Sequence, residues 1–163
     1  MAQNVTMPET IELFGDTYSV AYKTPTLWEY TKNEPVENWT KLVTLLNQNI
    51  NVDAKTFNMS FDKVLANQGV ARKVSSIDNE GNGYFLVVFP PTREQMSYEA
   101  LISKSFHPPK CKNVMIIQYA FKKPMLQQKP SKEEHEAIVN ELMQQLETYK
   151  KTLETNQWSP PCQ

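Results

Sequence analysis

The chain has 163 residues, of which 40% are hydrophobic and 21% charged, and this is the composition of one globular domain with a sizeable core. The formal net charge of −1 argues against attraction of the whole protein to nucleic acid, and no apolar run is long enough to predict a membrane span. Only two of the four glycines, Gly81 and Gly83, lie close together, which argues against a glycine-rich phosphate loop.

The first part of the chain predicts short strands. In residues 11–23 large apolar residues alternate with small or polar ones, which predicts two strands joined at Gly15-Asp16. Residues 24–38 contain two prolines and mixed charge and predict a connection. Residues 39–48 fit helical spacing as well, but their β-branched and aromatic residues favour a strand.

Two further pairs of strands are predicted in the second half. The turn DNEGNG, residues 78–83, is a strong hairpin signal between two apolar runs. A second pair is joined by the loop HPPKCK, residues 107–112. The four predicted strands are residues 71–77, 84–89, 98–106 and 113–121.

Two helices are predicted. Asp53 is placed to cap the first, whose apolar residues form a stripe at helical spacing. Ser131 and Glu134 form a capping box at the start of the second, a long amphipathic helix over residues 131–155.

These elements predict an α+β fold with a single antiparallel β-sheet of about six to seven strands. A central helix and the long C-terminal helix are expected to pack on one face of that sheet. The prediction is one domain over residues 1–163, with a flexible lead, a C-terminal helix and a tail at residues 1–9, 131–155 and 156–163.

The two cysteines, Cys111 and Cys162, allow one disulfide if the compartment is oxidising. Such a bond would close a loop of about 50 residues and stabilise the fold by roughly 3–4 kcal/mol. The alternative is a pair of reduced thiols in the cytosol. The terminal WSPPCQ favours the disulfide, because such a tail has little reason to be ordered without an anchor. We therefore expect a periplasmic or secreted protein whose signal peptide has been removed.

The segment PVENWTKLVT, residues 35–44, resembles a motif of small exported bacterial proteins of unassigned function, in which Val-Glu-Asn-Trp-Thr opens a strand. The order of elements is also similar to that of the PsbP/Mog1-like fold. This resemblance implies a protein that binds other proteins rather than a catalyst. From this resemblance we expect Trp39 and Thr40 to have a structural role and no catalytic one.

No catalytic or metal-binding constellation is predicted. His107 and Cys111 are four residues apart, but the two prolines between them exclude a regular helix. His135 falls in the first turn of a helix, where a solvated side chain is the ordinary expectation. Glu133, Glu134 and other acids fit helix starts and turns. We expect no catalytic residues, no metal and no cofactor.

A window without acids runs from Ala100 to Lys132 and contains seven lysines, whereas the rest of the chain carries net charge −8. It predicts a patch for an acidic protein partner, and anionic lipid or glycan fits as well. The chain has only two arginines, both outside the window, which argues against nucleic acid. Lysines at sheet edges also prevent aggregation, and this is the alternative. The predicted patch comprises two clusters at the ends of the hairpin: Lys104, His107, Lys110 and Lys112 near the loop, and Lys122 and Lys123 at the far end.

Three aromatic residues, Trp28, Tyr30 and Trp39, lie in or after the proline-containing connection and are candidates for an interface. The alternative is that they fold over the end of the sheet. The sequence thus predicts a non-enzymatic exported binding protein, such as an inhibitor, an immunity-type protein or an envelope accessory factor. The alternatives are a small-molecule or lipid carrier with a pocket between sheet and C-terminal helix, and an enzyme. The oligomeric state stays open.

Overall fold

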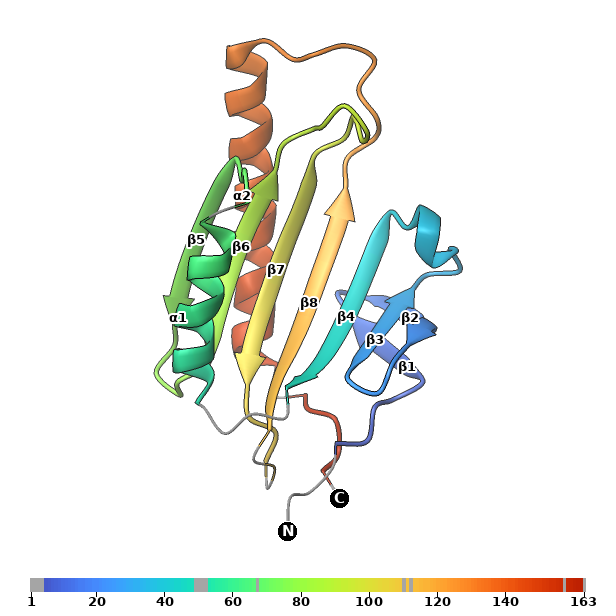
Figure 1. Cartoon of the computed structure of the whole chain (residues 1–163), viewed down its shortest axis with the longest axis vertical. Helices are drawn as coiled ribbons and strands as arrows, with labels where there is room; N and C mark the ends of the chain where they lie inside the picture. Colours follow the sequence, from blue (N-terminus) through green and yellow to red (C-terminus); the bar gives the residue numbers. More distant parts are fainter. Residues whose placement is uncertain are drawn as a thin grey trace.

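The computed structural model describes residues 5–48, 53–66, 68–109, 111, 113–156 and 158–162. The described chain forms one sheet, two α-helices and a short 3-10 turn (Figure 1). The strands are β1 (Thr10–Leu13), β2 (Asp16–Lys23), β3 (Leu27–Thr31), β4 (Lys41–Gln48), β5 (Arg72–Ile77), β6 (Gly83–Phe89), β7 (Glu99–Phe106) and β8 (Val114–Lys122). The helices are α1 (Ala54–Leu65) and α2 (Lys132–Thr155), and the 3-10 turn is η1 (Val36–Asn38).

The sheet is antiparallel throughout, with strand order β1-β2-β3-β4-β8-β7-β6-β5. The predicted α+β class, single antiparallel sheet and long C-terminal helix are confirmed. The predicted strand number is wrong, because the described sheet has eight strands. The additional strand, β3, lies inside the segment predicted as a connection, between its two prolines. Its residues LWEYT are strand formers, and the prolines mark its ends instead of excluding it.

The two helices lie on opposite faces of the sheet, with α1 in front and α2 behind in Figure 1. Alternate residues of β6 show the reason. Tyr84 and Leu86 pack into the core cluster that includes α2, whereas Phe85 and Val87 pack against the end of α1. The expectation that both helices share one face is therefore wrong. A strand as apolar as β6 is buried on both sides.

The larger of the two cores lies between α2 and the sheet. From α2, Leu142, Leu146 and Leu153 are almost fully buried against it. The predicted capping box begins this helix: Ser131 Oγ accepts from the Glu134 amide at 3.1 Å, and Glu134 Oε1 accepts from the Ser131 amide at 3.3 Å. Among the described residues, no helix is both long and apolar enough to cross a bilayer.

The hairpin between β1 and β2 turns at Phe14 and Gly15, whose φ angles are 51° and 83°. Two positive φ angles are typical of a type I′ turn, in which a bulky residue is unusual. Phe14 contributes its ring to an aromatic cluster, with ring centroids 5.0 Å from Tyr119 and 4.4 Å from Tyr149. These contacts stabilise the strained turn.

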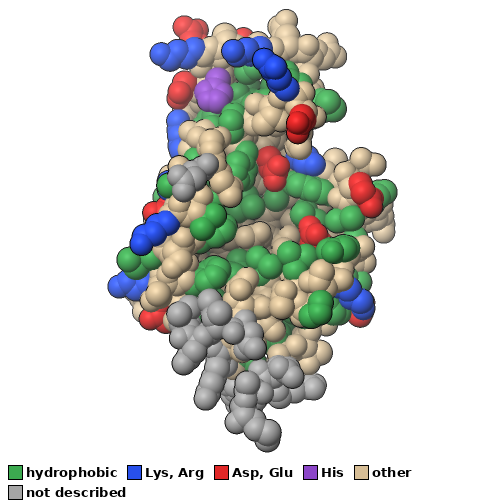
Figure 2. All heavy atoms as spheres, viewed as in Figure 1, with side chains coloured by type: hydrophobic (Ala, Val, Ile, Leu, Met, Phe, Trp, Pro, Cys, Tyr) green, Lys and Arg blue, Asp and Glu red, His purple; other side chains and the backbone are tan. Residues whose placement is uncertain are grey.

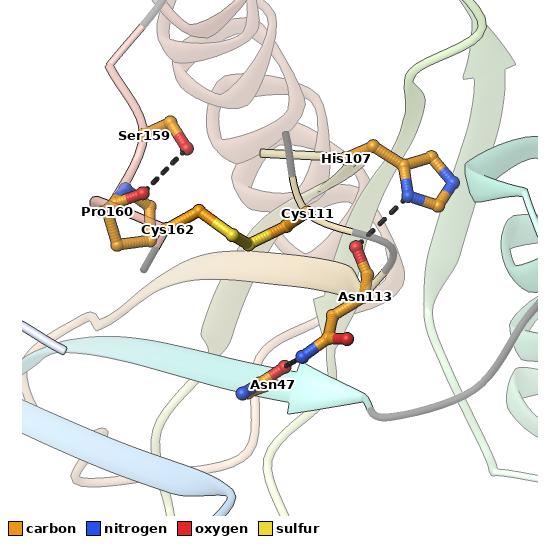
Figure 3. The surroundings of a disulfide bond; sticks show 7 residues. All are labelled: Asn47, His107, Cys111, Asn113, Ser159, Pro160 and Cys162. Atoms are coloured by element: carbon orange, nitrogen blue, oxygen red, sulfur yellow. Dashed lines mark hydrogen bonds between the residues drawn. A yellow bond between two sulfur atoms is a disulfide. The ribbon is translucent and has the colours of Figure 1, made fainter. Parts of the chain in front are cut away.

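The first and last described residues, Val5 and Cys162, lie together at the pole opposite the start of α2 (Figure 1). Cys111 and Cys162 form a disulfide with their Cα atoms 5.8 Å apart, so the predicted pairing is confirmed (Figure 3). Val5 forms an isolated bridge with Cys162, and the Thr6 amide donates to the carbonyl of Pro161 at 2.8 Å. Residues 5 and 6 of the predicted flexible lead are therefore held against the tail, and residues 1–4 lie outside the described chain.

Candidate binding site

The described members of the predicted lysine patch do not form one surface. Lys104 is only 8% exposed and lies under α2. Its Nζ donates to the carbonyls of Leu153 at 2.8 Å and Asn156 at 3.2 Å, at the C-terminal end of the helix. Burial lowers the pKa of Lys104, and nearby acids, Asp78 among them, oppose that shift. Lys104 therefore does not belong to a surface patch. Its ammonium group donates hydrogen bonds to carbonyls at the C-terminal end of α2, which have no partner within the helix.

The other members of the patch are dispersed. Lys122 lies 3.8 Å from the ring centroid of Trp39. Lys123 is bonded to Glu141 of α2 at 3.5 Å. His107 is exposed at the opposite end of β8, where its Nδ1 lies 3.0 Å from the carbonyl of Asn113 (Figure 3). Lys110 and Lys112 lie outside the described residues.

The predicted aromatic interface is also divided. Tyr30 is completely buried, and its hydroxyl donates to the carbonyl of Pro8 at 2.7 Å, so it is a core residue. Trp28 and Trp39 are half-buried, each beneath a lysine. This corresponds to the alternative in which the aromatic residues fold over the sheet.

The Val-Glu-Asn-Trp-Thr segment, residues 36–40, forms η1 and leads into β4, which begins at Lys41. Glu34 accepts hydrogen bonds from the Thr40 amide at 2.9 Å and the Thr40 hydroxyl at 2.7 Å. These bonds outweigh partial burial and lower the pKa of Glu34. The contacts position the entry to β4.

A cavity of about 680 Å³ lies where α2 begins. The β6–β7 connection forms one wall, and the β8–α2 connection with the first turn of the helix forms the other. The Lys123 amide donates to Tyr98 O at 3.0 Å, and the Leu126 amide donates to Met96 O at 2.6 Å. These two backbone bonds hold the walls together. The apolar part of the lining comprises Pro90, Pro91, Met96, Tyr98 and Pro130.

The charged part of the lining is entirely cationic among the described residues. It consists of Arg93, Lys129 and Lys132, with His135 beside them. All three cations are exposed, and none of the ion pairs found in the described chain includes one of them. Figure 2 shows several Lys and Arg side chains at this end of the molecule, with Asp or Glu side chains beside them.

Tyr98 and His135 form the floor of the cavity. The Tyr98 oxygen is 2.6 Å from Nδ1 of His135, and Tyr98 is fully buried. Burial, with the Glu134 charge, raises the pKa of Tyr98, so the phenol keeps its proton. A buried phenol beside exposed cations and an apolar wall fits the binding of an anionic group with an apolar part.

Sequence reasoning reached this cavity only in part. Lys129 and Lys132 belong to the acid-free window, and His135 was placed in the first turn of the helix. Arg93 and the proline wall carry no local signal that joins them to α2, because the sheet brings these segments together. No group of three or more metal-ligating side chains is found in the part of the chain that the structure describes.

Comparisons with known proteins identify one family. Its model matches residues 5–158, which include every residue of the cavity. No curated protein and no solved structure matches the chain. Because the match extends over nearly the whole sequence, the chain belongs to the protein family whose model matches residues 5–158.

Proposed function

We propose that this is a non-enzymatic binding protein that recognises an acidic segment of a protein partner. The single observation that supports the proposal most is the cavity at the start of α2, lined by three cations without an ion-pair partner in the described chain. Surface cations not engaged with the protein's own acids are available to an external anion. Their charge would raise the association rate and the specificity for acidic partners.

The apolar lining supports a peptide rather than a simple ion. Pro90, Pro91, Met96 and Pro130 offer surface that an inorganic anion does not use. A side chain such as Phe or Leu in an acidic segment would bury area there at about 25 cal/mol per Å². The proposed ligand is therefore a short segment in which carboxylates flank an apolar residue.

An extracytoplasmic location, periplasmic or secreted, is part of the proposal. The Cys111–Cys162 disulfide supports it, because such bonds persist in oxidising compartments. The resemblance of the Val-Glu-Asn-Trp-Thr segment to exported proteins supports it as well. An inhibitor, an immunity-type protein or an envelope accessory factor fits this combination.

The test is fluorescence polarisation with a labelled peptide, Glu-Glu-Phe-Glu-Glu, at two salt concentrations. The variant Lys132→Glu should weaken binding at least tenfold, and higher salt should weaken wild-type binding. Lys132 is the first residue of α2, where an acid favours the helix dipole, so the variant should keep its stability. Unchanged affinity in Lys132→Glu would contradict the proposal.

The matched control is Lys151→Glu, which reverses an exposed charge on the same helix, far from the cavity. Its affinity should equal that of the wild type. Equal losses in both variants would show that only net charge matters, and the site assignment would then be wrong.

A second candidate function is the binding of a small anionic molecule. One cavity between the sheet and α2, where Lys104, Ile117 and Leu153 meet, measures about 10 Å³ and is too small for a lipid. The cavity at the start of α2 has the volume of a small-molecule site. Octanoate tests this: binding of octanoate without binding of the peptide would favour the second candidate.

A further inference from the structure

One face of the sheet is only partly covered. On the face that carries α1, that helix packs on β5, β6 and β7. The next strands, β8, β4 and β3, have no α-helix in front of them in the described chain (Figure 1). Figure 2, drawn from the same side, shows hydrophobic side chains across this area with a few Asp or Glu side chains among them.

Strand register shows which side chains belong to this area. Phe85 packs against α1 and pairs with Ser103 of β7, so this row of residues lies on the α1 face. Ser103 pairs with Gln118 of β8, and Gln118 with Thr44 of β4. Thr44 pairs with Glu29 of β3, and residues two positions away along each strand share the face. We call this surface the open face, and its half-buried side chains include Leu27, Glu29, Leu46, Glu99, Leu101 and Gln118.

The helix α1 forms an apolar wall beside the open face. Asp62 of α1 binds Lys73 of β5, so that side of the helix faces the edge strand. Phe57 and Val64 lie two turns apart on the side away from Asp62, toward β7. Phe57 is half-buried, and Val64 is 52% exposed. A second helix placed beside α1 would therefore bury apolar side chains below it and along its side.

Two carboxylates of the open face lack a partner. Neither Glu29 nor Glu99 has a hydrogen bond or an ion pair among the described residues, and burial raises the pKa of both. Lys122 is the one cation that the four described strands place on this face, and it lies 3.8 Å from the ring centroid of Trp39. Two acids and one lysine leave a net charge of −1 there. A cation from a partner would stabilise the ionised carboxylates, so the charge favours a basic partner.

We propose that the open face binds a basic amphipathic α-helix of another protein, which lies beside α1. Strands are about 4.8 Å apart, so β8, β4 and β3 provide roughly the 10–12 Å that one helix occupies. Glu99 and Glu29 would lie on opposite flanks of that helix, on β7 and β3. Their rows are four residues apart on β8, roughly 13 Å. The partner helix therefore carries Lys or Arg on both flanks of an apolar stripe.

A second copy of the chain fits the open face less well. The body of α1 stands about 10 Å above the sheet, so the sheet of another copy would meet α1 before it reached β8. Contact between two open faces would also bring together four carboxylates and only two ammonium groups. An isolated basic helix avoids both problems.

The experiment is an NMR titration of the full chain with the capped peptide Lys-Leu-Lys-Ala-Leu-Leu-Ala-Lys-Leu-Lys-Ala-Leu-Leu-Ala-Ala. Its leucines form a stripe at helical spacing, with lysines on both flanks. Binding should shift the amide signals of Leu46, Leu101 and Gln118. Glu29→Lys should weaken binding about tenfold, and Glu99→Gln, which keeps the shape of the side chain, about 2–10-fold.

Matched controls separate the site from general attraction. Glu147→Lys reverses an exposed acid on α2, on the other face of the sheet, and should bind the peptide as the wild type does. The peptide with Glu in place of every Lys should not bind. The peptide with Pro in place of its central Ala should bind much more weakly, because Pro breaks the helix.

Four outcomes would overturn the proposal: no binding at millimolar peptide concentration, shifts centred away from the open face, equal losses in Glu29→Lys and Glu147→Lys, or equal binding of the Pro-containing peptide. Self-association through the open face without peptide, seen by analytical ultracentrifugation, would also overturn it. Lys132→Glu should bind this basic peptide normally, and Glu29→Lys should bind Glu-Glu-Phe-Glu-Glu normally. The two proposals therefore fail independently.

Discussion

Lys104 has a different role in the structure from the one that the sequence predicts. In the sequence it is one of seven lysines in an acid-free window. In the structure it alternates into the face of β7 that α2 covers, where it donates to two carbonyls at the end of that helix. Strand periodicity shows on which face a residue lies, but not which helix covers that face.

Lys104→Met keeps the length and apolar stem of the side chain but removes the donor. We expect the free energy of unfolding to fall by about 1–2 kcal/mol. Two carbonyls lose a charged hydrogen-bond donor, which destabilises the fold, and the cost of burying the ammonium group disappears, which offsets part of the loss. Denaturant unfolding measures this, and hydrogen exchange should show faster opening near Leu153. A variant as stable as the wild type would contradict the assigned role.

Gly83 has an ordinary φ angle but no room for a side chain. A Cβ there would lie 2.5 Å from Cγ of Asn58. Gly83→Ala should therefore destabilise the protein by about 1–3 kcal/mol. The loss should be smaller in an Asn58→Gly background, because that change removes both Cβ and Cγ of Asn58. Thermal unfolding of the single and double variants measures the coupling. Additive effects would contradict the close approach.

Glu99 provides a pH prediction. Burial raises the pKa of Glu99, and Lys122, its cross-strand neighbour, only partly opposes the shift. The folded state therefore holds the proton more tightly than the unfolded state. The stabilisation from this group is complete below the unfolded value of about 4.5 and is lost as pH rises through the higher folded pKa.

Glu99→Gln removes this dependence. The variant should be more stable than the wild type at pH 7, and the difference should shrink toward zero as the pH falls to about 4. Urea unfolding at a series of pH values measures the difference. A variant less stable at pH 7 would show that the Lys122 contact outweighs the burial.

At the scale of elements, the sequence predicted seven of the eight strands, both helices and the capping box. It missed β3 because two prolines near a short run suggest a connection. It also placed both helices on one face, although the continuous apolar run of β6 was compatible with burial on both faces. The cavity at the start of α2 depends on contacts between segments that are distant in the sequence. Of its charged and histidine residues, the sequence analysis therefore singled out only the two lysines and His135.

At the scale of the whole molecule, the disulfide joins the β7–β8 loop to the tail across 51 residues. Reduction, or Cys111→Ser, should lower the free energy of unfolding by about 3–4 kcal/mol, because the unfolded chain regains its loop entropy. Cys162→Ser should have the same effect, and the double variant should lose no more than either single variant. Denaturant unfolding with and without reductant measures this; a reductant-insensitive midpoint would contradict the stabilising role.

The central claim is that an acidic segment binds at the start of α2, and an NMR titration of the full chain with Glu-Glu-Phe-Glu-Glu tests it most directly. We predict that the amide shifts gather on both walls of the cavity, around Met96, Tyr98, Ser131 and His135, and that Lys132→Glu abolishes them at the same peptide concentration. Shifts gathered elsewhere, or unchanged in Lys132→Glu, would contradict the account.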